Sequence, residues 1–104
     1  MKVKIAKKDY KNLFDIVKEV DKKSYLTGFK SMLTRLDMVK SADDVDENKL
    51  CLKLEETEIF TLFDALAEYE EIIEKSSTTE EKKKRETIRK DLVSKLQKET
   101  GINV

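Results

Sequence analysis

The chain has 104 residues, of which 42% are charged and 38% are hydrophobic, and its 22 basic and 22 acidic side chains leave no net charge. A chain of this length builds one hydrophobic core, so we expect a single domain over 1–104. The scarcity of glycine and the absence of proline disfavour turn-rich sandwiches and barrels, which excludes an all-β fold. The absence of histidine excludes the usual zinc sites and every catalytic mechanism built on a histidine base.

The first predicted elements are a short strand and a helix. The sequence VKI at 3–5 alternates apolar and polar residues, as a strand does. Apolar residues then recur at intervals of three and four from Tyr10 to Val20, the spacing that places them on one face of a helix. We therefore expect the helix to cover about 7–22.

A second helix is expected after Ser24, whose side chain can cap it by accepting a hydrogen bond from a backbone N–H group. Apolar residues again recur in threes and fours from Tyr25 to Val39, so this helix ends near Lys40. The acidic segment 41–48 that follows has no periodicity, which indicates a loop.

A second strand and a third helix come next. The sequence KLCLKL at 49–54 alternates three leucines with Cys51 and lysine, a period of two that indicates a strand. A helix over about 56–75 then turns Ile59, Leu62 and other apolar residues inward and most of its glutamates outward.

The sequence SSTT interrupts the helical pattern and starts a fourth helix. Capping-box spacing, in which a hydroxyl residue precedes a glutamate by three positions, begins at Ser77 or at Thr78. The helix runs to about Thr100, where Gly101 can take the left-handed position that ends a helix. Its apolar stripe is short, so its first turns are expected to stand in solvent.

The chain resembles itself after a shift of 49 residues, which superposes Leu-Phe-Asp at 13–15 on Leu-Phe-Asp at 62–64. Either the chain is a duplication or any two strand-to-amphipathic-helix segments look this similar. The predicted fold is α+β and predominantly helical, with two short strands and four helices in two β-α-α units, 1–42 and 48–104, joined by the acidic loop 41–48. The units are expected to pair their strands about a local two-fold axis; the alternative is an all-α four-helix bundle.

The acidic segment in the middle of the chain is its largest cluster of charges of the same sign. Between residues 41 and 74 the only basic side chains are Lys49 and Lys53. Such a run is commonly a solvated face that keeps a protein soluble, but it also steers binding to a basic surface. The sequence thus predicts a non-enzymatic protein-interaction module, an adaptor or inhibitor, that binds a protein partner through Asp43, Asp44, Asp46, Phe60, Glu68, Glu70, Glu71 and Glu74.

Two residues of the third helix, Phe60 and Ala67, lie off its main apolar stripe and widen it. A second contact surface would explain them. A homodimer interface is the simplest such surface, and a partner protein is the other.

The alternative function is a small nucleic-acid-associated regulator that uses the basic first segment and the fourth helix. Zero net charge and the strong excess of lysine over arginine argue against specific DNA reading, because arginine is the preferred bidentate ligand of phosphate and guanine. In EEKKKRE, at 80–86, helical spacing pairs Glu80 with Lys84 and Glu81 with Arg85, so this run indicates a self-compensated exposed face.

A calcium loop and a reactive thiol are the remaining candidate sites. Asp44, Asp46, Asn48 and Glu55 have the ligand spacing of an EF-hand, but Lys49 stands where that loop requires glycine, so we expect no calcium site. The single cysteine has neither a histidine nor a helix start to lower the pKa of its thiol, which favours a structural role. We expect no cofactor, no metal ion and no enzymatic activity.

The location of the protein is predicted from the absence of apolar runs. The amino-terminal residues lack the apolar segment of a signal peptide, and no run approaches the roughly 20 residues of a membrane helix, so we expect a cytoplasmic protein that does not enter a membrane. Lysine excess is common in proteins of AT-rich genomes, and small proteins with an acidic patch and no enzymatic motif occur among the phage and mobile-element proteins that block host or defence factors. We expect such an origin on composition alone.

Overall fold

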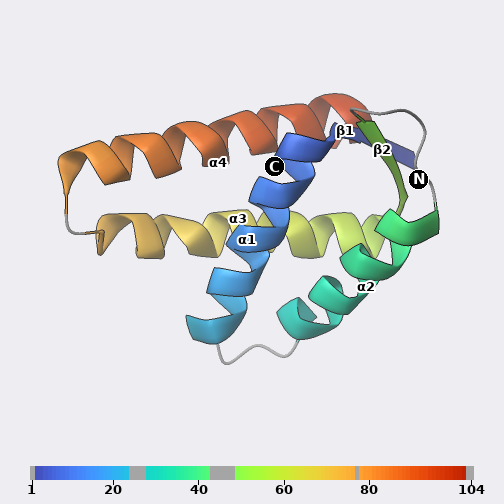
Figure 1. The fold of residues 1–104 in the computed structure, drawn as a ribbon, viewed down its shortest axis with the longest axis horizontal. Coiled ribbons are helices and arrows are strands. Elements are labelled where there is room, and N and C mark those ends of the chain that lie inside the picture. Colours follow the sequence, from blue (N-terminus) through green and yellow to red (C-terminus); the bar gives the residue numbers. More distant parts are fainter. Residues whose placement is uncertain (1, 24–27, 43–48, 77, 103–104) are drawn as a thin grey trace.

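Four helices and two strands make up the described part of the computed structural model, which covers residues 2–23, 28–42, 49–76 and 78–102. The elements follow one another as β1 (Lys2–Ala6), α1 (Lys7–Lys23), α2 (Gly28–Ala42), β2 (Lys49–Lys53), α3 (Glu56–Glu74) and α4 (Thr79–Thr100) (Figure 1). The predicted α+β, predominantly helical fold is confirmed, together with the predicted order of its elements. The strands exclude the all-α bundle.

The two strands pair antiparallel with each other, Val3 opposite Leu52 and Ile5 opposite Leu50. These four side chains are buried and face the helices, whereas the lysines that alternate with them are exposed. Strand alternation therefore gives the sheet one apolar face toward the core and one basic face toward solvent. Cys51 lies opposite Lys4 in the ladder and is buried.

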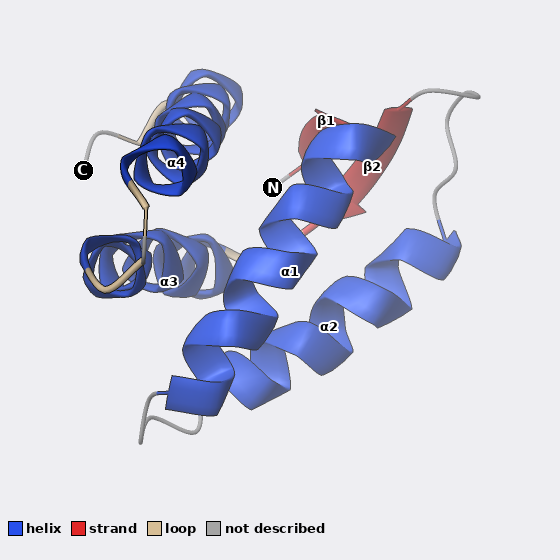
Figure 2. Cartoon of the chain, turned by 60° about the vertical axis from the view of Figure 1, so that its left-hand side comes forward, coloured by secondary structure: helices blue, strands red, loops and turns tan. Residues whose placement is uncertain are grey.

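The helices form two hairpins, α1 with α2 and α3 with α4, and α1, α2 and α4 contact the sheet. α1 contacts α2 and α3, and α3 contacts α4, so that one continuous core forms among them. Figure 1 shows α3 and α4 side by side and antiparallel, with α1 crossing over α3, and Figure 2 shows the α1–α2 hairpin from another side. The largest fully buried side chains come from all six elements, among them Val3, Leu13, Phe29, Leu52, Leu62 and Leu92.

The contacts between elements bear on the predicted two-fold arrangement. α2 packs on β2 and α4 packs on β1, which are equivalent contacts under the shift of 49 residues. The ladder also pairs Val3 with Leu52, two positions that this shift superposes. In the described residues, however, α1 contacts both strands and α3 contacts neither, so the two halves are not packed identically. Duplication of the chain stays a prediction.

The ends of α4 follow the predicted chemistry. The hydroxyl of Thr78 accepts a hydrogen bond from the backbone N–H of Glu81, at 3.1 Å, and Gly101 has the left-handed φ of 72°. Because only glycine adopts this φ at no steric cost, it ends the helix there. The predicted caps Ser24 and Ser77 lie outside the described residues.

Candidate functional site

The outer side of α3 carries most of the predicted partner-binding residues. A helix turns about 100° per residue, so the exposed residues of α3 are distributed around Phe60 within about 80° on either side. Phe60 itself is 44% exposed, although it is a large aromatic residue. We call this surface the acidic α3 face; its residues, all exposed, are Glu56, Phe60, Asp64, Ala67, Glu68, Glu71 and Glu74.

The start of α3 is held in place by residues of three elements. The side chain of Glu58 accepts a hydrogen bond from the backbone N–H of Glu55, at 2.9 Å, which satisfies a donor that the helix leaves open. Its other oxygen accepts a bond from Arg35 of α2, at 2.9 Å, and Arg35 also donates to the carbonyl of Lys53, at 3.1 Å. This cluster fixes the orientation of α3 relative to α2 and β2.

The carboxylates of the acidic α3 face form no ion pair with the residues that the structure describes. Within the part of the chain that the structure describes, no ion pair reaches Glu56, Asp64, Glu68, Glu71 or Glu74. Two of them, Glu68 and Glu71, line a shallow hollow of about 80 Å³ together with Lys23 and Lys75. These charges are therefore available to a partner.

The other predicted residues do not join this surface. Glu70 is exposed but turns toward α4, where it forms an ion pair of 2.9 Å with Arg89. The loop acids Asp43, Asp44 and Asp46 lie outside the described residues. Phe60 and Ala67 do share the exposed face, as the sequence predicted, whereas the exposed Met38 is on α2.

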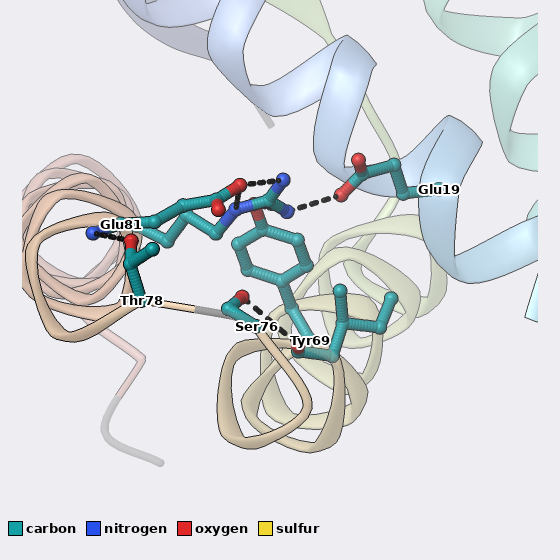
Figure 3. A network of polar contacts seen from close by, with 7 residues as sticks. Glu19, Tyr69, Ser76, Thr78 and Glu81 are labelled. Atoms are coloured by element: carbon teal, nitrogen blue, oxygen red, sulfur yellow. Dashed lines mark hydrogen bonds and ion pairs between the residues drawn. The ribbon is translucent and has the colours of Figure 1, made fainter.

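A polar network that the sequence did not predict joins α1, α3 and α4 around Arg85. Its guanidinium donates to Glu81 at 2.8 Å, to Glu19 at 3.0 Å and to the hydroxyl of Tyr69 at 3.0 Å. Figure 3 shows Tyr69 between Glu19 and Glu81. Burial, and then the negative charge of Glu19, raise the pKa of the Tyr69 phenol. Only the Glu81 bond follows from helical spacing; the predicted pair of Glu80 with Lys84 does not form.

A second polar network joins α1 to α4 near the start of α1. Lys95 donates to the buried Asp9 at 2.7 Å and lies 2.9 Å from Asp91 on its own helix. The bonds to Asp9 and then to Asp91 raise the pKa of Lys95. Asp9 and Lys95, with Thr87 and Asp91, line a hollow of about 420 Å³.

Each of the two networks places one cation between two carboxylates, Arg85 between Glu19 and Glu81 and Lys95 between Asp9 and Asp91. Every buried side-chain N or O atom that the structure describes has a partner. No cluster of three or more potential metal ligands occurs in the described ranges. Since each carboxylate in these networks already binds a cation of the chain, we interpret them as connections that hold the helices together.

Some of the cations of α4 form ion pairs in the same way. Arg85, Arg89 and Lys95 each pair with carboxylates of other elements or of α4 itself. The lysines near the start of the helix, Lys82, Lys83 and Lys84, are exposed. Among the described helices, none has the length and apolar character that crossing a membrane requires.

Comparison with protein-family models, with curated proteins and with solved structures finds no match for this chain.

Proposed function

We propose that this protein is a non-enzymatic interaction module that captures a basic protein surface through the acidic α3 face. The observation that carries the proposal is Phe60, a phenylalanine that is 44% exposed and surrounded by carboxylates that have no ion-pair partner among the described residues. Exposed aromatic residues that enter a pocket on a partner contribute much of the binding energy of interfaces, and surrounding charges speed association.

The electrostatics of the second half of α3 support this proposal, because the acidic residues there do not stabilise the helix. The last turn of α3 contains no basic residue, although Glu71 and Glu74 lie near the end where the helix dipole disfavours negative charge. Asp64 and Glu68 are four residues apart, and so are Glu70 and Glu74, which places like charges next to each other on the helix surface. A charge arrangement that weakens the helix favours a role in binding.

The proposal is tested by affinity capture from a cell lysate with the immobilised protein and two variants. Phe60→Ser removes the aromatic side chain from the acidic α3 face, and Met38→Ser is the matched control, because Met38 is 61% exposed on α2. We expect the wild type and Met38→Ser to retain the same protein in stoichiometric amounts. We expect Phe60→Ser to lose it, with a weakening of about tenfold or more.

The salt dependence of capture distinguishes an electrostatic interaction from non-specific hydrophobic adhesion. Since the carboxylates are solvent-exposed, raising the ionic strength should weaken capture mainly by slowing association. Capture that depends equally on Phe60 and Met38, or that is independent of salt, would contradict the proposal.

A homodimer is the competing explanation of the exposed phenylalanine. In that case the wild type would sediment as a dimer and Phe60→Ser as a monomer, with no second protein retained. The adaptor or inhibitor role, an origin in a phage or mobile element and cytoplasmic location stay predictions.

A further inference from the structure

A shallow hollow between α3 and α4 carries the opposite charge to the acidic α3 face. Its volume is about 470 Å³, and it lies where the two helices pack side by side. We call it the basic hollow; its lining residues are Ile73 of α3 and Lys82, Lys83, Glu86, Thr87 and Lys90 of α4.

The lysines of the basic hollow keep their charge available to a partner. Lys82 and Lys83 are exposed, and neither forms an ion pair with any residue that the structure describes. The side chain of Lys90 is 71% exposed and lies 3.9 Å from Glu86, a long separation for an ion pair. Glu86 is already bound to Arg89, at 2.7 Å. The hollow is therefore positively charged at its rim.

The chemistry of the basic hollow suits an aromatic side chain that has carboxylates beside it. The stems of the lysines are apolar and their ammonium groups stay in water, so that together with Ile73 they form an apolar floor with a charged rim. A phenyl ring packs on such stems, and its face attracts the ammonium groups. Carboxylates next to the ring then meet the lysines at the rim.

The acidic α3 face offers this combination on the same chain. Phe60 is 44% exposed, and Glu56 and Asp64 lie one helical turn to either side of it. Phe60 and Ile73 are 13 residues apart on α3, which is about 20 Å along the helix. Phe60 therefore cannot reach the hollow of its own molecule. Figure 1 shows the turn from α3 to α4 at one end of the molecule and the start of α3 far from it.

From this complementarity we propose that Phe60 of one molecule binds in the basic hollow of a second copy of the chain. The inference rests on the proposed function and deepens it, because it names a basic protein surface that the acidic α3 face binds. A net charge of zero supports it, since two copies do not repel each other as whole molecules. The contact joins two unlike surfaces and differs from a homodimer in which two copies of Phe60 meet.

The expected contact between copies is weak. The charges on both surfaces are exposed to solvent, where ion pairs contribute little, and Phe60 is the one large apolar side chain that the contact buries. We expect a dissociation constant between about 1 μM and 1 mM. A basic protein that binds the acidic α3 face more tightly would displace the second copy.

The test measures sedimentation velocity of the full chain over a range of concentrations at low and high salt. Phe60→Ser removes the aromatic ring. A second variant, which we call the hollow variant, removes the cations of the basic hollow by Lys82→Gln, Lys83→Gln and Lys90→Gln. The matched control removes the same charge from exposed positions outside both surfaces by Lys11→Gln, Lys18→Gln and Lys30→Gln.

The wild type and the control should sediment faster as their concentration rises, and high salt should weaken this effect. Phe60→Ser alone and the hollow variant alone should each associate about tenfold or more weakly than the wild type. An equimolar mixture of these two variants should associate again. Phe60→Ser retains the basic hollow and the hollow variant retains Phe60, so the mixture can form one complete contact.

Capture from a lysate distinguishes this inference from the proposed function. The hollow variant keeps the acidic α3 face, so it should retain a basic protein as well as the wild type does. If the copies associate through the hollow but no other protein is retained, the proposed function is wrong and this inference stands.

The mixture also separates binding from folding, because only a folded hollow variant presents Phe60 on a helix. The inference is overturned if the wild type stays a monomer up to about 1 mM, or if the mixture of the two variants does not associate. It is also overturned if the control loses association as the hollow variant does. Association of the hollow variant at the strength of the wild type would overturn it as well, since the contact would then not involve the hollow.

Discussion

Among the described residues, Asp9 is the charged residue that is buried in the core. It is 7% exposed, and its side chain accepts a hydrogen bond from Lys95. Removal of Asp9 loses a buried, charge-assisted hydrogen bond together with the packing of its side chain, whereas removal of an exposed ion-pair partner costs little. Asp9 also lies in the first turn of α1, where the helix dipole favours negative charge. Its role in stability is therefore larger than that of Asp91, the other partner of Lys95.

We predict that Asp9→Ala lowers the free energy of unfolding by about 1–3 kcal/mol, measured by urea denaturation. Asp91→Ala is the matched control, because its side chain is 51% exposed and bonds to the same Lys95. The control should change stability by less than about 1 kcal/mol. Equal losses in the two variants would show that burial of Asp9 contributes nothing.

Two buried tyrosines make the free energy of unfolding depend on pH. Burial raises the pKa of Tyr69 and of Tyr10, and the charges of Glu19 and Asp37 add to the two shifts respectively. An unfolded tyrosine loses its proton near pH 10. Above that pH the unfolded state binds fewer protons than the folded state, so the free energy of unfolding falls as the pH rises.

We therefore expect urea denaturation to show decreasing stability from about pH 10 upward, and the decrease should be smaller in Tyr69→Phe, which cannot ionise. Lysine titration affects both proteins alike, so the difference between them isolates the phenol. A variant whose stability falls as steeply as that of the wild type would rule out this contribution of Tyr69.

At the scale of elements, the start of α4 depends on a single side-chain cap. Thr78 accepts the N–H of Glu81 at 3.1 Å, while the first turns of the helix bury no side chain. We predict that Thr78→Ala costs about 1 kcal/mol and reduces the helical circular dichroism signal. Thr79→Ala, at the next position, should cost less than about 0.5 kcal/mol. The cap is unimportant if the two substitutions have the same effect.

Periodicity was sufficient to predict the elements, and the reason is visible in their faces. The buried positions of α1, which include Tyr10, Leu13 and Val20, follow the spacing of three and four that the sequence shows. Phe60 could be recognised as exposed because it departs from that spacing on α3. Thr78 and Gly101 could be identified because caps act within a few residues.

The polar networks and the pairing of the two strands could not be predicted in the same way, because they join residues distant in sequence. The bond from Arg85 to Glu19 spans 66 residues, and that from Lys95 to Asp9 spans 86. Their formation depends on how helices cross, which local patterns do not specify. The meeting of Lys2 with Lys53 likewise requires the antiparallel register.

At the scale of the whole molecule, the contacts bind the two predicted half-units into one structure. β1 pairs with β2, α4 packs on β1, and α1 crosses α3, so each half-unit completes its core with elements of the other. Neither half-unit can bury its apolar face by itself. We infer that the chain unfolds in one cooperative step.

Leu52 tests this cooperativity, because it is fully buried on β2 and faces Val3 of the other half-unit. We predict that Leu52→Ala lowers the free energy of unfolding by about 2–5 kcal/mol. Helical circular dichroism and tyrosine fluorescence, which samples Tyr10 in the first half and Tyr69 in the second, should shift to lower urea together. Lys4→Ala, at the exposed position next to Val3, should leave the midpoint nearly unchanged. A cavity beside the Val3–Leu52 pair destabilises both halves only if the halves share one core. Two separate unfolding transitions, in the wild type or in Leu52→Ala, would therefore mean that the half-units fold independently.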